Sequence, residues 1–370
     1  DSSGDNAPRE DLDSDPGWGG DTPMDECGVF AIYAPGADVA RATYFGLHAL
    51  QHRGQESAGI ATGDGYQLRL HADLGLVTQI FREEDLQSLT GHLAIGHTRY
   101  STKGAPRRYN VQPHIVRGPD VEFAMGHNGN VINAAEIRRE LGEWGVEFKA
   151  SSDSEVIAKL FAHAPADTWE KRSAYCMRKL RGAFALVAAT KNEIVGIRDP
   201  LGIRPLCLGK LQNGWVLASE SCALYNIGAE FVREIEPGET VVIDKEGPRS
   251  YLWSGRETGP HSMCVFEQIY IARPDSILAG QLAHSARVRM GKELARMHPA
   301  EADICIGVPD SGTAHAAGYA EESGIPYSEG LIKNRYVNRT FIQPDQALRD
   351  LGVQLKFNPL VDMIAGKRVV

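Results

Sequence analysis

Several features that would place the chain in a common class are missing from its 370 residues. No apolar run is long enough to cross a bilayer, and the first residues lack the basic start and apolar core of a secretory signal. Basic residues are in the minority, since 39 Lys and Arg stand against 48 Asp and Glu. The net charge of -9 argues against a general nucleic-acid binder. We therefore expect a cytoplasmic protein that binds neither nucleic acid nor membrane.

Cysteine is also scarce, and no two cysteines form a Cys-x-x-Cys pair. The six are scattered over the chain: Cys27, Cys176, Cys207, Cys222, Cys264 and Cys305. This distribution suits a reduced cytoplasm better than a disulfide framework.

Aliphatic residues are nearly absent from residues 1–26, which contain nine acidic residues and one arginine. Such a segment cannot bury enough apolar surface to offset the entropy lost on ordering. We expect residues 1–26 to be a disordered acidic leader, or propeptide, with ordered structure beginning at Cys27.

The remaining sequence has the composition of a globular protein, with 42% hydrophobic and 24% charged residues, and its length suits two domains. Strand-like runs alternate with helical segments as far as residue 243, which predicts a sheet core with helices outside. Residues 247–261 are polar and rich in Gly, Pro and Ser. We place the boundary there, with a first domain over residues 27–255 and a second over residues 256–370.

Beyond the boundary, a helix over residues 286–297, a buried strand over 303–308 and a helix over 314–322 are expected. This alternation predicts an α/β domain with a parallel sheet. A further strand begins at residue 367, so the second domain is expected to be incomplete.

Cys27 has two interpretations. A lone free cysteine at the start of a strand is most often a small buried hydrophobe. Alternatively, Cys27 becomes the first residue when the leader is removed, and its own α-amine, with a pKa of about 8, serves as the base for its thiol. With Glu26 still attached, that nitrogen is an amide and has no useful basicity.

Four polar motifs follow, and each has a structural as well as a functional interpretation. They are residues 51–59, 96–102, 126–130 and 151–155. Taken singly, the first fits a helix end, the third a tight turn and the fourth a capping box. The residue sequences of the four motifs and their order along the chain together favour a functional role.

Through these motifs, residues 27–237 resemble the N-terminal-nucleophile glutamine amidotransferases. The resemblance implies an α+β domain of four αββα layers, in which Cys27 attacks the carboxamide of glutamine and releases ammonia. It also implies that Asn128 and Gly129 form an oxyanion hole, whose donors are typically worth ~2.7–4 kcal/mol each. In some members of this family, a leader that precedes the cysteine is removed.

The same resemblance implies how glutamine is held. Arg99 would bind the α-carboxylate, which fits the planar fork of a guanidinium. Asp153 would bind the α-ammonium, and Arg53 would lie on a loop that helps to order the glutamine site.

The second domain decides which acceptor receives the ammonia. Its motifs resemble, in their order, the amidophosphoribosyltransferase family: residues 264–276, 288–291, 308–312 and 330–342 follow a related segment at 198–206. The resemblance implies transfer of ammonia to phosphoribosyl pyrophosphate, giving 5-phosphoribosylamine, the first committed step of purine synthesis. Acceptors such as those of glucosamine-phosphate or asparagine synthesis are disfavoured by these motifs.

Three basic residues belong, by this resemblance, to a loop that closes over phosphoribosyl pyrophosphate: Lys333, Arg335 and Arg339. Basic side chains suit a pyrophosphate, Mg²⁺ would accompany it as a cation that prefers oxygen ligands, and closure would exclude water. An exposed basic loop without this role is the alternative.

The resemblance further implies parts beyond Val370. In the family, a strand and a loop with paired aspartates follow, so we expect a C-terminally truncated chain. The alternative function is therefore an unprocessed, truncated chain that is silent for transfer and retains at most glutaminase activity. Cys264 matches one ligand of a [4Fe–4S] cluster in some members, and the other three of the four thiolates would lie beyond the chain. A homo-oligomer is also implied.

Overall fold

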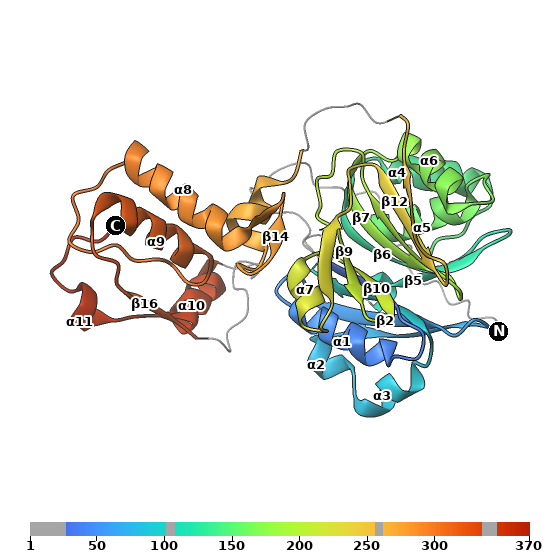
Figure 1. Cartoon of the computed structure of the whole chain (residues 1–370), viewed down its shortest axis with the longest axis horizontal. Helices are drawn as coiled ribbons and strands as arrows, with labels where there is room; N and C mark the ends of the chain where they lie inside the picture. The colour runs from blue at the N-terminus through green and yellow to red at the C-terminus, as the bar shows by residue number, and fades with distance from the viewer. Residues whose placement is uncertain (1–26, 101–107, 256–261, 335–345) are drawn as a thin grey trace, which may run out of the picture.

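The computed structural model describes residues 27–100, 108–255, 262–334 and 346–370 (Figure 1). Its N-terminal part contains two antiparallel sheets with helices on their outer faces. Its C-terminal part consists mainly of helices and lies beside the first (Figure 1). Within the described ranges, no helix combines the length and the apolarity that crossing a bilayer requires.

The first sheet has seven strands in the order β11-β9-β10-β1-β4-β2-β3. Its central strand, β1, alternates its side chains between the two faces, because successive residues of a strand point to opposite sides. Phe30 and Ile32 face one layer, whereas Val29 and Ala31 face the other. The strands are β1 (Gly28–Tyr33), β2 (Ser57–Gly63), β3 (Leu68–Leu74), β4 (Leu93–Arg99), β9 (Cys207–Leu211), β10 (Gly214–Ala218) and β11 (Glu230–Glu234).

The second sheet has six strands in the order β13-β12-β8-β7-β6-β5. They are β5 (His114–Arg117), β6 (Glu122–Val131), β7 (Gly182–Ala189), β8 (Ile194–Arg198), β12 (Glu239–Asp244) and β13 (Gly247–Leu252). The two sheets pack face to face over one apolar cluster. That cluster takes Val29, Ala31 and Ile95 from the first sheet and Ala185 and Val187 from the second.

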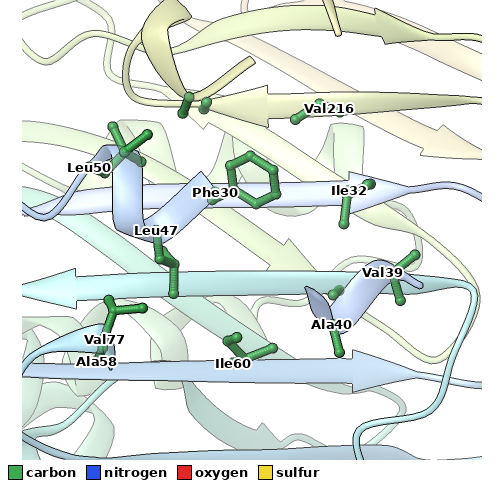
Figure 2. Close-up of a cluster of buried hydrophobic side chains, with 14 of the residues drawn as sticks. Phe30, Ile32, Val39, Ala40, Leu47, Leu50, Ala58, Ile60, Val77 and Val216 are labelled. Atoms are coloured by element: carbon green, nitrogen blue, oxygen red, sulfur yellow. The ribbon is translucent and has the colours of Figure 1, made fainter. Parts of the chain in front are cut away.

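Helices cover the outer face of each sheet. Over the first lie α1 (Val39–Ala49), α2 (Val77–Ile80), α3 (Glu83–Ser88) and α7 (Ser221–Tyr225). Figure 2 shows Leu47 and Leu50 of the α1 region beside Phe30 and above the strands. Over the second lie α4 (Ala134–Glu143), α5 (Asp153–His163) and α6 (Trp169–Lys179). The order helix, sheet, sheet, helix confirms the predicted four-layer αββα arrangement.

The C-terminal part begins with a π-helical turn, η2 (Glu267–Ile271), and a short hairpin of β14 (Ile277–Leu278) and β15 (Gln281–Leu282). Two helices then pack closely, α8 (Ala283–Met297) and α9 (Ser311–Ser323). Glycines permit this approach: a Cβ on Gly291 would lie 1.9 Å from the oxygen of His315. The remaining elements are β16 (Leu331–Lys333), α10 (Gln346–Lys356), β17 (Phe357–Pro359) and α11 (Val361–Ile364).

Parallel pairing in the second domain is limited in the described residues. Ile304 pairs in parallel with Val369, and Cys305 pairs with Tyr327. The strand expected over residues 303–308 is therefore reduced to two single bridges, although its direction agrees with a parallel sheet. The described strand pairs β14–β15 and β16–β17 are antiparallel.

Part of the polar segment at the expected boundary forms regular structure. Residues 247–252 form β13 at the edge of the second sheet and pair with β12. An edge strand with polar residues on its open face carries little apolar signal, and an edge position tolerates Pro248. We retain the division at residue 255 as a proposal, since β13 belongs with the first domain and η2 with the second.

Candidate active site

The start of β1 places Cys27 opposite the end of β4. In the pairing of β1 with β4, Gly28 faces Thr98, so the next position outward brings Cys27 opposite Arg99. Arg99 also faces Ser57 of β2. Cys27 is buried, with an exposed fraction of 6%. Burial at a strand start satisfies the structural interpretation of this cysteine, so its polar neighbours must decide between the two interpretations.

Asn128 of β6 makes a polar contact with Cys27. The backbone nitrogen of Cys27 donates a hydrogen bond to Asn128 Oδ1 at 3.3 Å. Asn128 is fully buried, and its Nδ2 has no hydrogen-bond partner among the residues that the structure describes. An unpaired buried amide donor costs free energy and calls for a functional explanation. Because Oδ1 is taken by Cys27, Nδ2 is the end of this amide that is available to a ligand.

Gly129 follows with a backbone that only glycine adopts readily. Its φ is +146°, and a Cβ there would lie 2.1 Å from the carbonyl oxygen of Ala183. The dipeptide does not form the tight turn that was its structural interpretation, because β6 runs on through it to Val131. The dipeptide Asn128-Gly129 is thus held inside the sheet rather than in a free turn, which gives it a fixed geometry.

Asp153 lies at the first position of α5, where Ser152 caps the helix. Its Oδ2 accepts a hydrogen bond from the backbone nitrogen of Val131 at 2.9 Å. The carboxylate is therefore tied to β6 two residues beyond Gly129. Arg99 is mostly buried, and its Nη1 lies 3.4 Å from Glu56 Oε1. The structure thus places a guanidinium at the end of β4, next to the strand that follows Cys27, and the Asp153 carboxylate at the start of α5, bonded to the strand that carries Asn128.

Buried histidines lie under this region. His97 of β4 donates through Nε2 to the carbonyl oxygen of His127 at 2.9 Å, and its Nδ1 has no partner among the described residues. Burial lowers the pKa of His97 to about 3. Burial, and then the charge of Arg99, lower the pKa of His114 to about 4. Both rings are therefore neutral near neutral pH, and they place no extra positive charge beside Arg99.

Arg53 lies elsewhere, at the contact between the two domains. Its guanidinium is fully buried, with Nε 2.6 Å from Glu220 Oε1 and Nη1 3.3 Å from Glu267 Oε1, while Nη2 also bonds Glu267. Two more side chains contact these carboxylates, since His52 Nε2 lies 2.7 Å from Glu220 and Arg204 Nη1 lies 3.2 Å from Glu267. Arg53 therefore joins the loop after α1 to the second domain, and its role toward glutamine stays a prediction.

Glu220 extends this contact. Its Oε2 accepts hydrogen bonds from the backbone nitrogen of Arg273 at 2.9 Å and from Ser276 Oγ at 2.7 Å. Burial by itself would raise the pKa of Glu220, but the nearby His52 and Arg53 hold that pKa below its ordinary value. Sequence reasoning missed Glu220, because a single glutamate outside any motif gives no signal. Glu267 lies within the motif at residues 264–276, but the sequence assigned no role to it.

A cavity of about 430 Å³ lies next to this contact, between the loop after α1 and the C-terminal part. His52 and Gln55 line it from the first domain, and Asp310, Gly312 and Lys333 line it from the second. Lys333 Nζ forms an ion pair with Asp310, the residue before α9. A helix N-terminus with a nearby ammonium group suits an anionic ligand. Arg335 and Arg339, predicted for the same loop, lie outside the described residues.

Metal ligands do not gather in the part of the chain that the structure describes. No group of three or more His, Cys, Asp or Glu side chains there is arranged to hold a metal ion. The backbone nitrogen of Cys264 donates to the carbonyl oxygen of Ile203 at 3.1 Å, just before η2. The described residues therefore do not fit a four-thiolate cluster, and Cys264 as a ligand stays a prediction.

The site combines two facing sheets, a cysteine immediately before the central strand, and a buried amide next to a positive-φ glycine. These features define the class of N-terminal-nucleophile glutamine amidotransferases. A family model described as a glutamine amidotransferase domain matches residues 97–226. The chain is 50% identical over 372 residues to the amidophosphoribosyltransferase of Mycobacterium tuberculosis (strain ATCC 25618 / H37Rv), covering 98% of this chain and 68% of the relative. It is 51% identical over 366 residues to that of Synechococcus elongatus, covering 97% and 74%. The chain belongs to the amidophosphoribosyltransferase family, a family of glutamine-dependent transferases.

Solved structures agree with this assignment. One, described as the structure of the allosteric regulatory enzyme of purine biosynthesis, matches with a TM-score of 0.85 and 44% identity, covering 93% of this chain and 73% of that one. The glutamine phosphoribosylpyrophosphate amidotransferase from B. subtilis complexed with ADP and GMP matches with a TM-score of 0.84 and 44% identity, covering 93% and 74%.

Proposed function

We propose that this chain hydrolyses glutamine with Cys27 and passes the ammonia to phosphoribosyl pyrophosphate, as the names of its relatives indicate. The observation that carries the glutaminase half is the bond from Cys27 N to Asn128 Oδ1, which leaves a buried Nδ2 donor beside the nucleophile. A preorganised donor of this kind stabilises the oxyanion that forms when a carbonyl is attacked.

The first step forms a bond between Cys27 Sγ and the carboxamide carbon of glutamine. The α-amine of Cys27 takes the thiol proton, and the negative charge moves to the carboxamide oxygen, where Asn128 Nδ2 and the Gly129 N–H donate. Collapse expels ammonia, which receives the proton, and leaves a thioester. Water then cleaves the thioester to release glutamate and restore the thiol.

Two charged residues, one at the end of β4 and one at the start of α5, would bind the α-carboxylate and the α-ammonium of glutamine. Arg99 pairs with the α-carboxylate, for which its planar fork is suited. Asp153 accepts from the α-ammonium. Both assignments are proposals, supported by the positions of Arg99 opposite Cys27 and of Asp153 beside β6.

The transfer half would use the cavity between the domains. Ammonia would attack C1 of phosphoribosyl pyrophosphate and displace pyrophosphate, giving 5-phosphoribosylamine. Lys333 and the start of α9 would bind the pyrophosphate. Mg²⁺ would accompany that substrate, because it prefers oxygen ligands such as phosphate. A homo-oligomer also stays a proposal, which sedimentation would check.

The decisive experiment is mass spectrometry of the purified chain together with an assay of ammonia release. A mass that begins at Cys27, labelling of Cys27 by a glutamine-like diazo ketone, and loss of ammonia release in Cys27→Ala are expected. A chain that retains Glu26 and never releases ammonia would support the silent alternative. Ammonia release by Cys27→Ala at the unaltered rate would overturn the nucleophile assignment.

A further inference from the structure

Behind the Asn128-Gly129 dipeptide lies a closed ring of three buried polar side chains. Gln112 Oε1 accepts from the backbone nitrogen of His127 at 2.8 Å, and Gln112 Nε2 donates to Ser154 Oγ at 3.0 Å. Ser154 Oγ lies 3.1 Å from His127 Nδ1, which closes the ring. Each of the three residues has an exposed fraction of 5% or less. Although His127 Nε2 has no hydrogen-bond partner among the described residues, each of the three residues is hydrogen-bonded to the other two, which favours a single arrangement.

The ring replaces a missing part of the sheet. β5 pairs with β6 from His114 opposite Met125 to Arg117 opposite Glu122, and this register continued by two residues would bring Gln112 opposite His127. There the side chain of Gln112 supplies the acceptor that a strand backbone would otherwise offer. His97 Nε2 donates to the carbonyl oxygen of the same His127. Both backbone polar groups of His127 are therefore held by side chains.

Two side chains at the start of α5 attach β6 on either side of the dipeptide. Ser154 bonds His127, the residue before Asn128. Asp153 accepts from Val131 N, two residues after Gly129. The segment with the +146° φ is thus fixed at both ends to the helix turn that carries the proposed ammonium-binding carboxylate. An unusual backbone conformation persists only when the surrounding structure enforces it.

We propose that Gln112 and Ser154 are positioning residues, which hold the oxyanion donors and the Asp153 carboxylate in one fixed relation to a single glutamine molecule. The inference rests on the proposed glutaminase function. Neither residue touches the reacting atoms. Their effect arises because the oxyanion donors act at the carbonyl, whereas Asp153 acts at the α-ammonium. A small shift of α5 against β6 would misalign one with the other.

Ser154→Ala in the chain processed to Cys27 is the primary test. The substitution removes the hydroxyl oxygen that Gln112 Nε2 and His127 Nδ1 both contact. We expect kcat/KM for glutamine hydrolysis to fall by about tenfold or more, because misplacement of ~1 Å costs about 10²-fold. The fall should divide between a lower kcat and a higher KM. Ser154→Thr, which keeps the hydroxyl, should recover most of it.

Ser173→Ala is the matched control. Ser173 is a buried serine of α6 whose Oγ has no hydrogen-bond partner in the described part of the chain. The same atom is removed from the same helical layer, so kcat and KM should stay at their unaltered values. Gln112→Glu is a second variant in case Ser154→Ala does not fold. It keeps an acceptor for His127 N and replaces the donor toward Ser154 by an oxygen.

A substrate comparison separates positioning from stability. Glutaramate is glutamine without its α-amino group, so it cannot use Asp153. The unaltered chain should prefer glutamine over glutaramate strongly, and this preference should shrink several-fold in Ser154→Ala. A lower melting temperature with unchanged kcat, KM and preference would overturn the inference. If Cys27→Ala is inactive while Ser154→Ala matches Ser173→Ala, only this inference fails. If Cys27→Ala retains activity, the proposed function fails.

Discussion

The backbone nitrogen of Cys27 lies 3.3 Å from Oδ1 of Asn128, across 101 positions of the sequence. The contact joins the residue immediately before the central strand of one sheet to the middle of β6 in the other. It fixes the orientation of the Asn128 amide, because Oδ1 accepts and Nδ2 is left as the donor. An amide nitrogen and a terminal amine can both donate, so this orientation does not depend on whether residue 26 is attached.

The first prediction concerns the free end of that amide. Asn128→Ala removes Nδ2, and we expect kcat for glutamine hydrolysis to fall by about 10²–10³, the usual cost of one oxyanion donor. The KM should change little, since the donor acts on charge that develops during reaction. Steady-state ammonia release checks this, with the exposed Asn192→Ala as control. A raised KM with an unchanged kcat would assign Asn128 to ground-state binding instead.

Gly129 gives a second prediction. In Gly129→Ala, the new Cβ would meet the Ala183 oxygen at 2.1 Å in a backbone with φ of +146°, so either the fold or the local strand must yield. We expect lower thermal stability and loss of glutaminase activity. The control is Gly142→Ala, in α4, where nothing lies within 4 Å and alanine should add up to about 1 kcal/mol of helix stability. Equal melting temperatures for the two variants would contradict the steric argument.

The buried contact between the domains gives a third prediction. Glu267→Ala would remove one of the two buried carboxylates, Glu220 and Glu267, that pair with Arg53. Removing one partner of a buried ion pair costs about 3–5 kcal/mol, so urea denaturation should show a large loss of stability. Asp167→Ala breaks the exposed pair with Lys171 and should change stability little. A small effect at Glu267 would contradict the prediction and show that Glu220 alone is a sufficient partner for Arg53.

How far the sequence leads can be judged from particular residues. The motifs around Arg99, Asn128 and Asp153 were recognisable because each is a run of consecutive residues, and the fold brings those runs to the edges of two facing sheets. Runs of β-branched and aromatic residues such as β1 were equally clear. The four-layer class and the family were therefore predictable before any coordinates.

Contacts between isolated residues were not predictable. Gln112 contacts His127 across 15 positions of the sequence and Ser154 across 42. A single glutamine in the sequence does not indicate which distant residue it will bond. Glu220 meets Arg53 across 167 positions for the same reason. Edge strand β13 was also missed, because its polar residues carry no apolar alternation. Tertiary packing, rather than local propensity, decides all of these features.

The last prediction concerns acid stability. Burial lowers the pKa of His97 to about 3, and burial together with Arg99 lowers the pKa of His114 to about 4, both from an ordinary value of 6.5. Below pH 6.5 the unfolded chain therefore binds these protons more readily than the folded chain does. The stability that the neutral rings contribute is complete above pH 6.5 and is lost progressively as the pH falls from 6.5 toward 4 for His114 and toward 3 for His97, by about 1.4 kcal/mol per pH unit for each linked proton. His97→Gln removes one such group while offering an amide in place of the Nε2 donor to His127. Urea denaturation between pH 7 and pH 4 should show that the free energy of unfolding falls less steeply with pH in this variant than in the unaltered chain, by about one proton's slope.

The control is His284→Gln, on the exposed side of α8, which should leave the slope unchanged. Parallel curves for His97→Gln and the unaltered chain would show that His97 is not among the groups that drive acid unfolding.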